Sequence, residues 1–135
     1  MLKSILMSLL LISSLYATEY KVIYNVTTAK ADTVKGSLLK GIPALEKHYK
    51  NQGDTLKATI IISSGAYKFF SEGSEFKNAV ERLSNEGVVF EVCSMGMKKR
   101  GIKKEDLLPF VTPVFNRTSS LIEWQGKGYS LVNVE

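Results

Sequence analysis

Two short runs of apolar residues constrain the fold of this chain more than any other feature. They are "ATIII" (residues 58–62) and "VVFEV" (residues 88–92), and both are rich in β-branched residues. A strand with one solvent-exposed face alternates apolar and polar residues, whereas a strand covered on both faces is apolar almost throughout. In a parallel sheet, the connecting helices cover both faces. The two runs therefore predict inner strands of a parallel sheet.

Three further runs have strand character, and helical segments lie between them. The runs are residues 20–26, residues 129–134 and, more weakly, residues 111–115. Strands that alternate with helices are typical of βαβ units. We therefore predict an α/β fold in which five strands form one mainly parallel sheet.

Apolar residues at helical spacing fill the gaps between the strands. Asp32 is the predicted N-cap of the first helix, and Pro43 predicts a kink or a division into two shorter helices. Ser74 is the predicted N-cap of the second helix, which Gly87 ends. The predicted helical segments are residues 34–49, residues 76–83, a short helix from just after Cys93 to near Gly101, and residues 119–125.

The first 17 residues, "MLKSILMSLLLISSLYA", have the three-part layout of a secretory signal peptide. Lys3 precedes an apolar run that is too short to span a bilayer, and small and polar residues lead to Ala17. We predict cleavage after Ala17, a single domain over residues 18–135, and a periplasmic or secreted location. The alternative is a buried or amphipathic first helix. No later stretch is long and apolar enough for a membrane span, so we expect no membrane contact after cleavage.

The charge and the motifs narrow the class of protein. The formal net charge is +5 at pH 7, and it falls to +4 with the loss of Lys3. This excess is too small and too dispersed to predict nucleic-acid binding. The sequence has no CxxC pair, glycine-rich phosphate loop or histidine-rich metal motif. We therefore expect no cofactor and no nucleic-acid partner.

Cys93 is the only cysteine, so the chain forms no internal disulfide. It follows the run at residues 88–92 and precedes a helical segment with three basic residues, 98–100. In open parallel sheets, chemistry gathers beyond the carboxyl ends of the strands. A helix N-terminus and nearby basic side chains favour the nucleophilic thiolate. Burial acts in the other direction, so an inert core cysteine stays open as the alternative.

A resemblance to a known family favours the reactive cysteine. The segment "VCSMGMKKRGIKKEDLLPFV" (residues 92–111) resembles the V-C and R-G-[IVL]-x-x-x-D-L-L-P-x-V pattern of the DsrE/DsrF-like family, above all its periplasmic, signal-bearing members. The stretches "KVIYNV", "SSGAYKFF" and "QGKGYSLVNV" extend the likeness over nearly the whole mature chain. The resemblance implies a three-layer α/β/α sandwich with a five-stranded parallel sheet.

The same resemblance implies a function. Characterised members of the family act in sulfur relay and carry sulfur as a persulfide on a cysteine, which corresponds to Cys93 here. The resemblance thus implies a sulfurtransferase-like persulfide carrier that forms homo-oligomers. Its expected partner is a protein that donates or accepts sulfur, or a small thiol.

Residues near Cys93 complete the predicted site. Backbone donors are expected over residues 94–97, and Gly96 permits the close approach of a partner. Gly65 and Tyr67 follow the strand at residues 58–62 and are expected at the same sheet edge. Arg117 could add charge at the mouth of the site, and a solvated surface position is its default interpretation. The predicted site residues are Cys93, Ser94, Met95, Gly96, Met97, Arg100, Gly65 and Tyr67.

Two other functions fit the same residues. Cys93, Met95 and Met97 are soft ligands suited to Cu(I), and on an extended backbone they would share one face. On the predicted helix they point in different directions, which favours core packing of both methionines. The alternatives to sulfur handling are therefore a non-enzymatic soft-metal-binding module and an oligomeric interaction module that uses Tyr67 and nearby aromatic residues.

Overall fold

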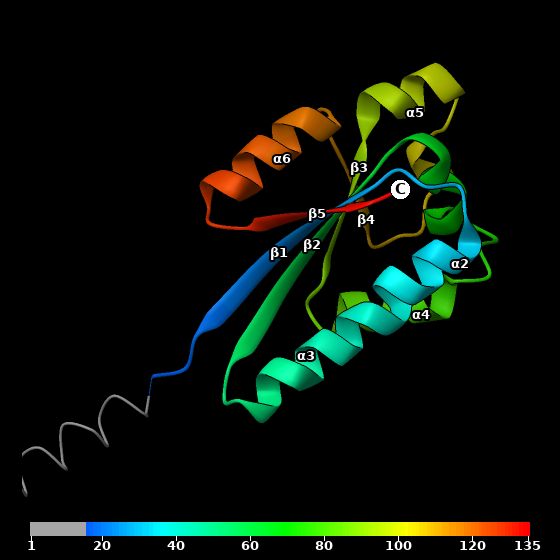
Figure 1. The fold of residues 1–135 in the computed structure, drawn as a ribbon. Helices are drawn as coiled ribbons and strands as arrows, with labels where there is room; N and C mark the ends of the chain where they lie inside the picture. The colour runs from blue at the N-terminus through cyan, green and yellow to red at the C-terminus, as the bar shows by residue number, and fades with distance from the viewer. Residues whose placement is uncertain (1–15) are drawn as a thin grey trace, which may run out of the picture.

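The computed structural model describes residues 16–135, and a five-stranded sheet lies at its centre (Figure 1). The strand order is β4–β3–β2–β1–β5, and every pair of neighbours is parallel. The strands are β1 (Glu19–Val26), β2 (Thr55–Ile62), β3 (Val89–Cys93), β4 (Val111–Val114) and β5 (Ser130–Val134). All five lie where the sequence predicts them, and helices cover both faces. The predicted α/β/α sandwich is therefore confirmed.

The order of the strands explains which helix covers which face. Strands β1 to β4 follow one another across the sheet in one direction, and the chain then returns to place β5 beyond β1. Crossovers between parallel strands are right-handed, so a connection that runs in the reverse direction places its helix on the opposite face. Accordingly, α6 (Arg117–Gly126) lies on one side of the sheet, and α2, α3 and α4 lie on the other (Figure 1).

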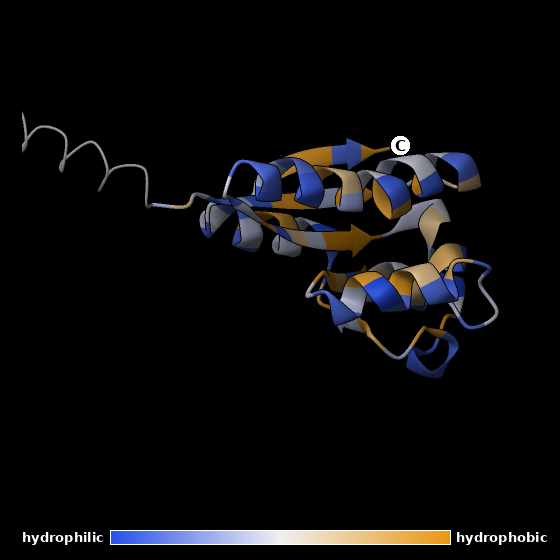
Figure 2. Ribbon diagram, turned by 90° about the horizontal axis from the view of Figure 1, so that it is seen from below, coloured by the Kyte–Doolittle hydropathy of each residue, from blue (hydrophilic) through white to orange (hydrophobic). Residues whose placement is uncertain are grey.

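The face under α2 (Ala31–Val34), α3 (Gly41–Asn51) and α4 (Lys77–Asn85) holds the main hydrophobic core. Alternate residues of each strand point to this face. Figure 2 shows the apolar residues concentrated on the strands and the hydrophilic residues on the outer sides of the helices. The core residues of the three central strands are Val22, Tyr24, Val26, Ala58, Ile60, Ile62, Phe90 and Val92. We call this side of the sheet the core face.

The opposite face, under α6, is more polar, and we call it the α6 face. The side chains of Ser120 and Trp124 in α6 donate hydrogen bonds to Glu91 Oε1 of β3, at 2.6 and 2.8 Å. These two bonds tie α6 to the sheet. The buried and half-buried residues of the three central strands that point to this face are Lys21, Ile23, Asn25, Thr59, Ile61, Glu91 and Cys93.

The first helical segment differs in detail from the prediction. Lys30 is its N-cap, and Asp32 lies in the first turn instead of at the predicted capping position. There the carboxylate still meets the positive end of the helix dipole. A π-helical segment, η1 (Lys35–Lys40), separates α2 from α3, and Pro43 lies in the first turn of α3. Because proline has no N–H to donate, a regular α-helical ladder cannot run unbroken through this segment. The predicted interruption therefore takes the form of a π-helical segment inside one continuous helical run over residues 31–51, and not of two separate helices.

Helices α4 and α5 (Ser94–Arg100) lie close to their predicted ranges. Phe76, and not the predicted Ser74, is the N-cap of helix α4, which ends before Gly87. Ser74 Oγ instead accepts a hydrogen bond from the N–H of Phe76 at 3.1 Å, in the turn before the helix. Helix α5 begins directly after Cys93 and ends at Gly101, which has a φ of 67°. This left-handed conformation is favourable for glycine and ends many helices.

Helix α6 begins at Arg117, earlier than the predicted residue 119. The reason is its N-cap: Asn116 Oδ1 accepts a hydrogen bond from the N–H of Ser119 at 2.7 Å. Asparagine is among the most favourable residues for this role. The first turn of α6 therefore starts immediately after β4, at the edge of the sheet where β3 also ends.

Two 3-10 segments lie outside the helices that the sequence predicts. They are η2 (Ser64–Phe70) and η3 (Lys104–Asp106). The two leucines after η3, Leu107 and Leu108, are buried, and the N–H of Leu108 donates to the carbonyl oxygen of Phe70 at 3.0 Å. The "DLLP" part of the family-like segment thus anchors η2 against the core. Its role is to hold the fold together near Cys93.

The predicted signal peptide falls almost entirely outside the described residues. Within residues 16–135, no helix combines the length and the apolar character that crossing a membrane requires. Contacts with the sheet begin at Thr18, whose N–H donates to Asp54 Oδ1 at 2.8 Å and whose carbonyl oxygen accepts from the N–H of Thr55 at 3.0 Å.

Candidate functional site

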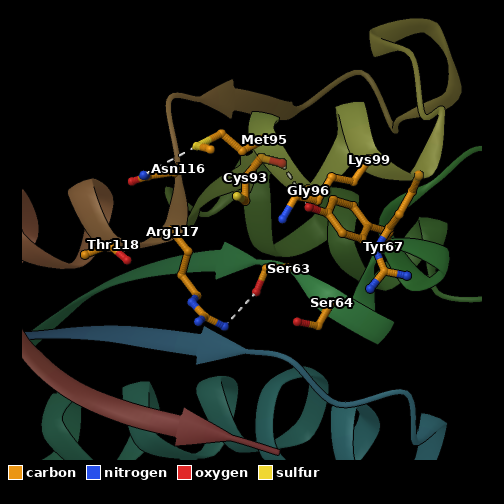
Figure 3. A pocket seen from close by; sticks show the side chains of 11 residues that line it. Ser63, Ser64, Tyr67, Cys93, Met95, Gly96, Lys99, Asn116, Arg117 and Thr118 are labelled. Atoms are coloured by element: carbon orange, nitrogen blue, oxygen red, sulfur yellow. Dashed lines mark hydrogen bonds between the residues drawn. The ribbon is translucent and has the colours of Figure 1, made fainter.

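A pocket of about 410 Å³ lies beyond the carboxyl ends of β2, β3 and β4 (Figure 3). Parallel strands end at the same edge of a sheet, so residues from distant parts of the chain meet there. The segments that follow these strands, η2, α5 and α6, supply most of the lining. The lining residues are Ser63, Ser64, Tyr67, Cys93, Met95, Gly96, Lys99, Arg100, Asn116, Arg117 and Thr118.

Cys93 is the last residue of β3 and the N-cap of α5, as the sequence predicts. Its side chain points to the α6 face, because its strand neighbour Val92 points into the main core. Cys93 is 8 % exposed and lines the pocket. The only thiol of the chain therefore lies in the wall of a pocket and outside the main core.

Tyr67 packs directly beside Cys93. Its hydroxyl donates a hydrogen bond to the backbone carbonyl oxygen of Cys93 at 2.9 Å, and the residue is 3 % exposed. The pKa of Tyr67 is raised to about 12, chiefly by burial and further by the negative charge and hydrogen bonding of Cys93, while Arg100 and Arg117 act to lower it. At neutral pH the phenol is therefore uncharged and serves as a hydrogen-bond donor.

Gly96 makes the position of Tyr67 possible. It lies within α5, and a Cβ atom added to it would be 2.1 Å from the Tyr67 hydroxyl oxygen. Any larger residue would displace the phenol or the helix. The close approach predicted at Gly96 is thus made by Tyr67 of the same chain.

Three basic residues line the pocket that Cys93 lines. The guanidinium carbon of Arg100 lies 5.5 Å from the centre of the Tyr67 ring, in cation–π geometry. Arg117 Nη1 donates to Ser63 Oγ at 3.3 Å, and Lys99 also lines the pocket. None of the lining residues is acidic. The lining of the pocket therefore favours anionic ligands.

Ser63 and Ser64 line the pocket where β2 ends, and Gly65 follows them. Ser63 is buried at the end of β2, and Ser64 has a φ of 56°, in the left-handed region that residues with side chains seldom adopt. Gly65 follows, and a Cβ atom added there would be 2.7 Å from Ala29 Cβ. Gly65 thus lets η2 pass close to the segment after β1. Strained backbone of this kind is often found at functional sites.

The structure brings together five of the predicted site residues and separates three. Gly65 lines a neighbouring groove. Ser94 and Met97 line a hollow on the far side of α5, and Met97 is 6 % exposed within the core, whereas Met95 is 47 % exposed. The five that share the pocket are Cys93, Met95, Gly96, Arg100 and Tyr67.

The soft-metal alternative depends on three residues that the structure does not bring together. Cys93 and Met95 share the pocket, but Met97 packs in the core on another side of α5. This is the divergence expected when residues two apart lie on a helix. In residues 16–135, no three side chains of His, Cys, Asp or Glu gather in a way that would hold a metal ion.

Several lining residues were not predicted as part of the site. Their common signal is position: residues 63–64 directly follow β2, and residues 116–118 directly follow β4, at the edge where β3 ends in Cys93. Arg117, interpreted from the sequence as a solvated residue, points toward Ser63 in the pocket (Figure 3). The residues that sequence analysis missed are Ser63, Ser64, Lys99, Asn116, Arg117 and Thr118.

Comparisons with known proteins agree with this fold. The model of the DsrE/DsrF-like family matches residues 44–134. The structure is similar to MTH1491, a protein of unknown function from Methanobacterium thermoautotrophicum, with a TM-score of 0.76 and 20 % identity over 84 % of this chain and 98 % of that one. It is also similar to the YchN protein of E. coli, with a TM-score of 0.59 and 19 % identity over 85 % of this chain and 98 % of that one. No match was found among curated proteins.

Proposed function

This chain belongs to the DsrE/DsrF-like family, which is associated with sulfur relay, and on that premise we propose that it is an exported carrier of sulfur that acts through Cys93. The observation that carries the proposal is the place of the only thiol in a pocket lined by cations. A core cysteine would be surrounded by apolar side chains and would be inert.

The proposed chemistry needs little more than this pocket. The Cys93 thiolate attacks the sulfane sulfur of a donor, a Cys93 persulfide forms, and the donor's leaving group departs with the electron pair of the broken bond. An acceptor thiolate later attacks the terminal sulfur and regenerates the Cys93 thiolate. The positive charges of Arg100 and Arg117, which line the same pocket, attract an anionic donor and stabilise the persulfide anion.

Tyr67 and Gly96 hold the backbone of Cys93 in place. The hydrogen bond from Tyr67 fixes the carbonyl group of Cys93, and Gly96 leaves room for the phenol. Tyr67 stays protonated at neutral pH, so this bond persists in the working range of the thiol. The backbone that carries the Cys93 side chain is therefore held in place beside the pocket.

Export and self-association belong to the same proposal. Cleavage after Ala17 would give Thr18 a charged amino group, and the Thr18 nitrogen already lies 2.8 Å from a carboxylate oxygen of Asp54. Such a pair is stronger when both groups are charged. The exposed Met95 and Phe115 beside the pocket would suit contacts with another copy or with a sulfur-exchanging protein.

Intact-mass analysis of the protein after export tests the proposal. We expect an N-terminus at Thr18 and rapid labelling of the native protein by iodoacetamide. Incubation with a sulfane-sulfur donor should add the mass of one sulfur atom, which dithiothreitol removes. The Cys93→Ser variant is the matched control and should show neither change. Labelling of Cys93 only after denaturation would contradict the proposal.

A further inference from the structure

The charge of the pocket indicates what kind of donor it accepts. We infer that the pocket binds a small anionic sulfur donor of the thiosulfate class, in which the transferable sulfur is attached to a sulfonate group. This inference rests on the proposed function, because it takes Cys93 as the residue that receives the sulfur.

The pocket carries positive charge that no acidic lining residue compensates. Lys99, Arg100 and Arg117 line the pocket without an acidic residue among their lining neighbours. Within residues 16–135, the ion pairs join Lys57 to Glu19 and Lys77 to Glu72, all residues outside this pocket. Clustered cations that lack carboxylate partners repel one another, so binding of an anion relieves this repulsion. A neutral donor would gain nothing from this arrangement.

The acidic residue closest to Cys93 in the sequence does not alter this balance. Glu91 lies two positions earlier on the same face of β3, but it does not line the pocket. Its Oε1 atom accepts hydrogen bonds from Ser120 and Trp124. The carboxylate is therefore held under α6, and the pocket keeps its positive charge.

The pocket also contains side chains that can donate hydrogen bonds to a ligand. Arg117 reaches Ser63, and the hydroxyl groups of Ser64 and Thr118 line the same pocket (Figure 3). A sulfonate group has three oxygen atoms that accept hydrogen bonds, and a guanidinium supplies paired donors in a fork. The pocket thus offers donors of the type that an oxyanion requires, together with a nucleophile.

Thiosulfate can transfer its sulfane sulfur to Cys93 in a single displacement. The Cys93 thiolate attacks the sulfane sulfur of thiosulfate, a bond forms between the two sulfur atoms, and the sulfur–sulfur bond of thiosulfate breaks. Sulfite leaves with the electron pair of that bond, and Cys93 becomes a persulfide anion, so no further oxidant or reductant is needed. The thiolate and the thiosulfate dianion repel each other. The cations around Cys93 offset this repulsion as the two approach.

Access to the thiol also favours a small ion. Cys93 is 8 % exposed in the wall of a pocket of about 410 Å³. An ion of a few heavy atoms enters such a space without rearrangement of the fold. We therefore assign the free ion, and not a sulfonate carried on a large partner, as the donor.

The test uses the purified full chain as processed on export, with thiosulfate as the donor. Persulfide on Cys93 and sulfite in solution are measured together, and we expect one sulfite for each sulfur loaded. The variant Arg117→Gln should slow this loading about tenfold to a hundredfold, the worth of a charge-assisted hydrogen bond. Arg117→Lys should keep part of the rate. Arg82→Gln removes the same charge from the exposed side of α4 and should not change it.

A pair of alkylating reagents separates anion binding from the reactivity of the thiol. Iodoacetate and iodoacetamide share a leaving group, but only iodoacetate is an anion. We expect Arg117→Gln to slow iodoacetate labelling more than iodoacetamide labelling. Equal slowing by both reagents would overturn the inference, because Arg117 would then act only on the thiol.

A second donor distinguishes failure of the inference from failure of the proposed function. Sulfur loading from a small uncharged alkyl persulfide, without any loading from thiosulfate, would overturn the anionic donor and leave the carrier function standing. Absence of loading from both donors would overturn both.

Discussion

The two faces of the sheet are built differently, although they share the same strands. Adjacent residues of β2 show the contrast. Ile60 on the core face is paired in register with Tyr24 and Phe90, which belong to the main hydrophobic cluster, whereas Ile61 on the α6 face is paired with Asn25 and Glu91. Three helices cover the first face, and α6 covers the second.

The α6 face is built less favourably for stability than the core face. Asn25 Oδ1 and Thr59 Oγ1 are buried there and make no hydrogen bond within residues 16–135. Unpaired buried polar groups are costly, so a face built for stability alone would be apolar. Cys93 points to this face, and Arg117 of α6 reaches the pocket beside it. The core face stabilises the fold, and the α6 face holds the site.

The largest expected effect on stability comes from replacing Ile60 and Ile61, one at a time, by alanine. Both are fully buried. We expect Ile60→Ala to lower the free energy of unfolding by about 4 kcal/mol and Ile61→Ala by about 2 to 3 kcal/mol. The smaller loss is expected for Ile61 because α6 covers its face and can shift to fill part of the cavity. Urea unfolding measures both values.

The rate of Cys93 alkylation provides the second readout for these variants. Ile61→Ala should change the rate, because Ile61 and Cys93 lie on the same face, and Ile60→Ala should leave it close to the wild-type value. A greater loss of stability for Ile61→Ala would contradict the assignment of stability to the core face.

A test of intermediate size concerns the contact that joins η2 to α5. In Gly96→Ala, the added methyl group would clash with the Tyr67 hydroxyl and break its bond to the Cys93 carbonyl group. We expect a net loss of about 1 to 2 kcal/mol, since the gain in helix propensity offsets part of the clash. Chemical unfolding measures the loss, and iodoacetamide labelling should show altered access to Cys93.

Gly126→Ala is the matched control for Gly96→Ala. Gly126 is also helical, at the end of α6, and a Cβ atom there meets nothing within 4 Å. This variant should be neutral or slightly more stable than the wild type. An equal loss in both variants would show that the effect belongs to helical glycines in general and not to the Tyr67 contact.

The smallest expected effect is the dependence of stability on pH at Tyr67. The pKa of Tyr67 is raised from its ordinary 10.0 to about 12, so the folded state holds the phenolic proton more tightly than the unfolded state. The resulting contribution to stability is complete below about pH 10 and is lost as the pH rises through 12. At neutral pH, Tyr67→Phe should cost about 1 kcal/mol, the value of one hydrogen bond.

Unfolding of the wild type and of Tyr67→Phe at a series of alkaline pH values measures this effect. The difference between the two proteins should shrink as the pH rises from 10 to 12. A difference that stays constant over this range would show that Tyr67 does not hold its proton more tightly in the folded state.

Much of the fold was predictable because its signals are local. The β-branched runs define β2 and β3, and apolar residues at helical spacing define α4 and α5. Glycines at 87 and 101 end helices, as predicted. Asp32 and Ser74 were wrong as N-caps, since the helices begin after Lys30 and Phe76, and residue type alone does not fix which of several neighbouring residues begins a helix.

The site was predictable in part. Cys93, Gly96 and Arg100 lie in one continuous segment, and the resemblance to the DsrE/DsrF-like family identified that segment. Arg117 and Ser63 follow other strands, and nothing in their local sequence marks them as neighbours of the thiol. Their roles become visible only when the strand order is known.

The sequence by itself determined the strands, most of the helices and the position of Cys93 where a strand meets a helix, because periodicity and backbone preferences act over a few residues. Tertiary structure alone decided which face each element covers and which side chains meet. The return of the chain from β4 to β5 places α6 on the face of Cys93, and helical phase turns Met95 outward and Met97 into the core. The physical reason is that parallel pairing joins residues far apart in the chain, and the pocket exists only where three strands end together.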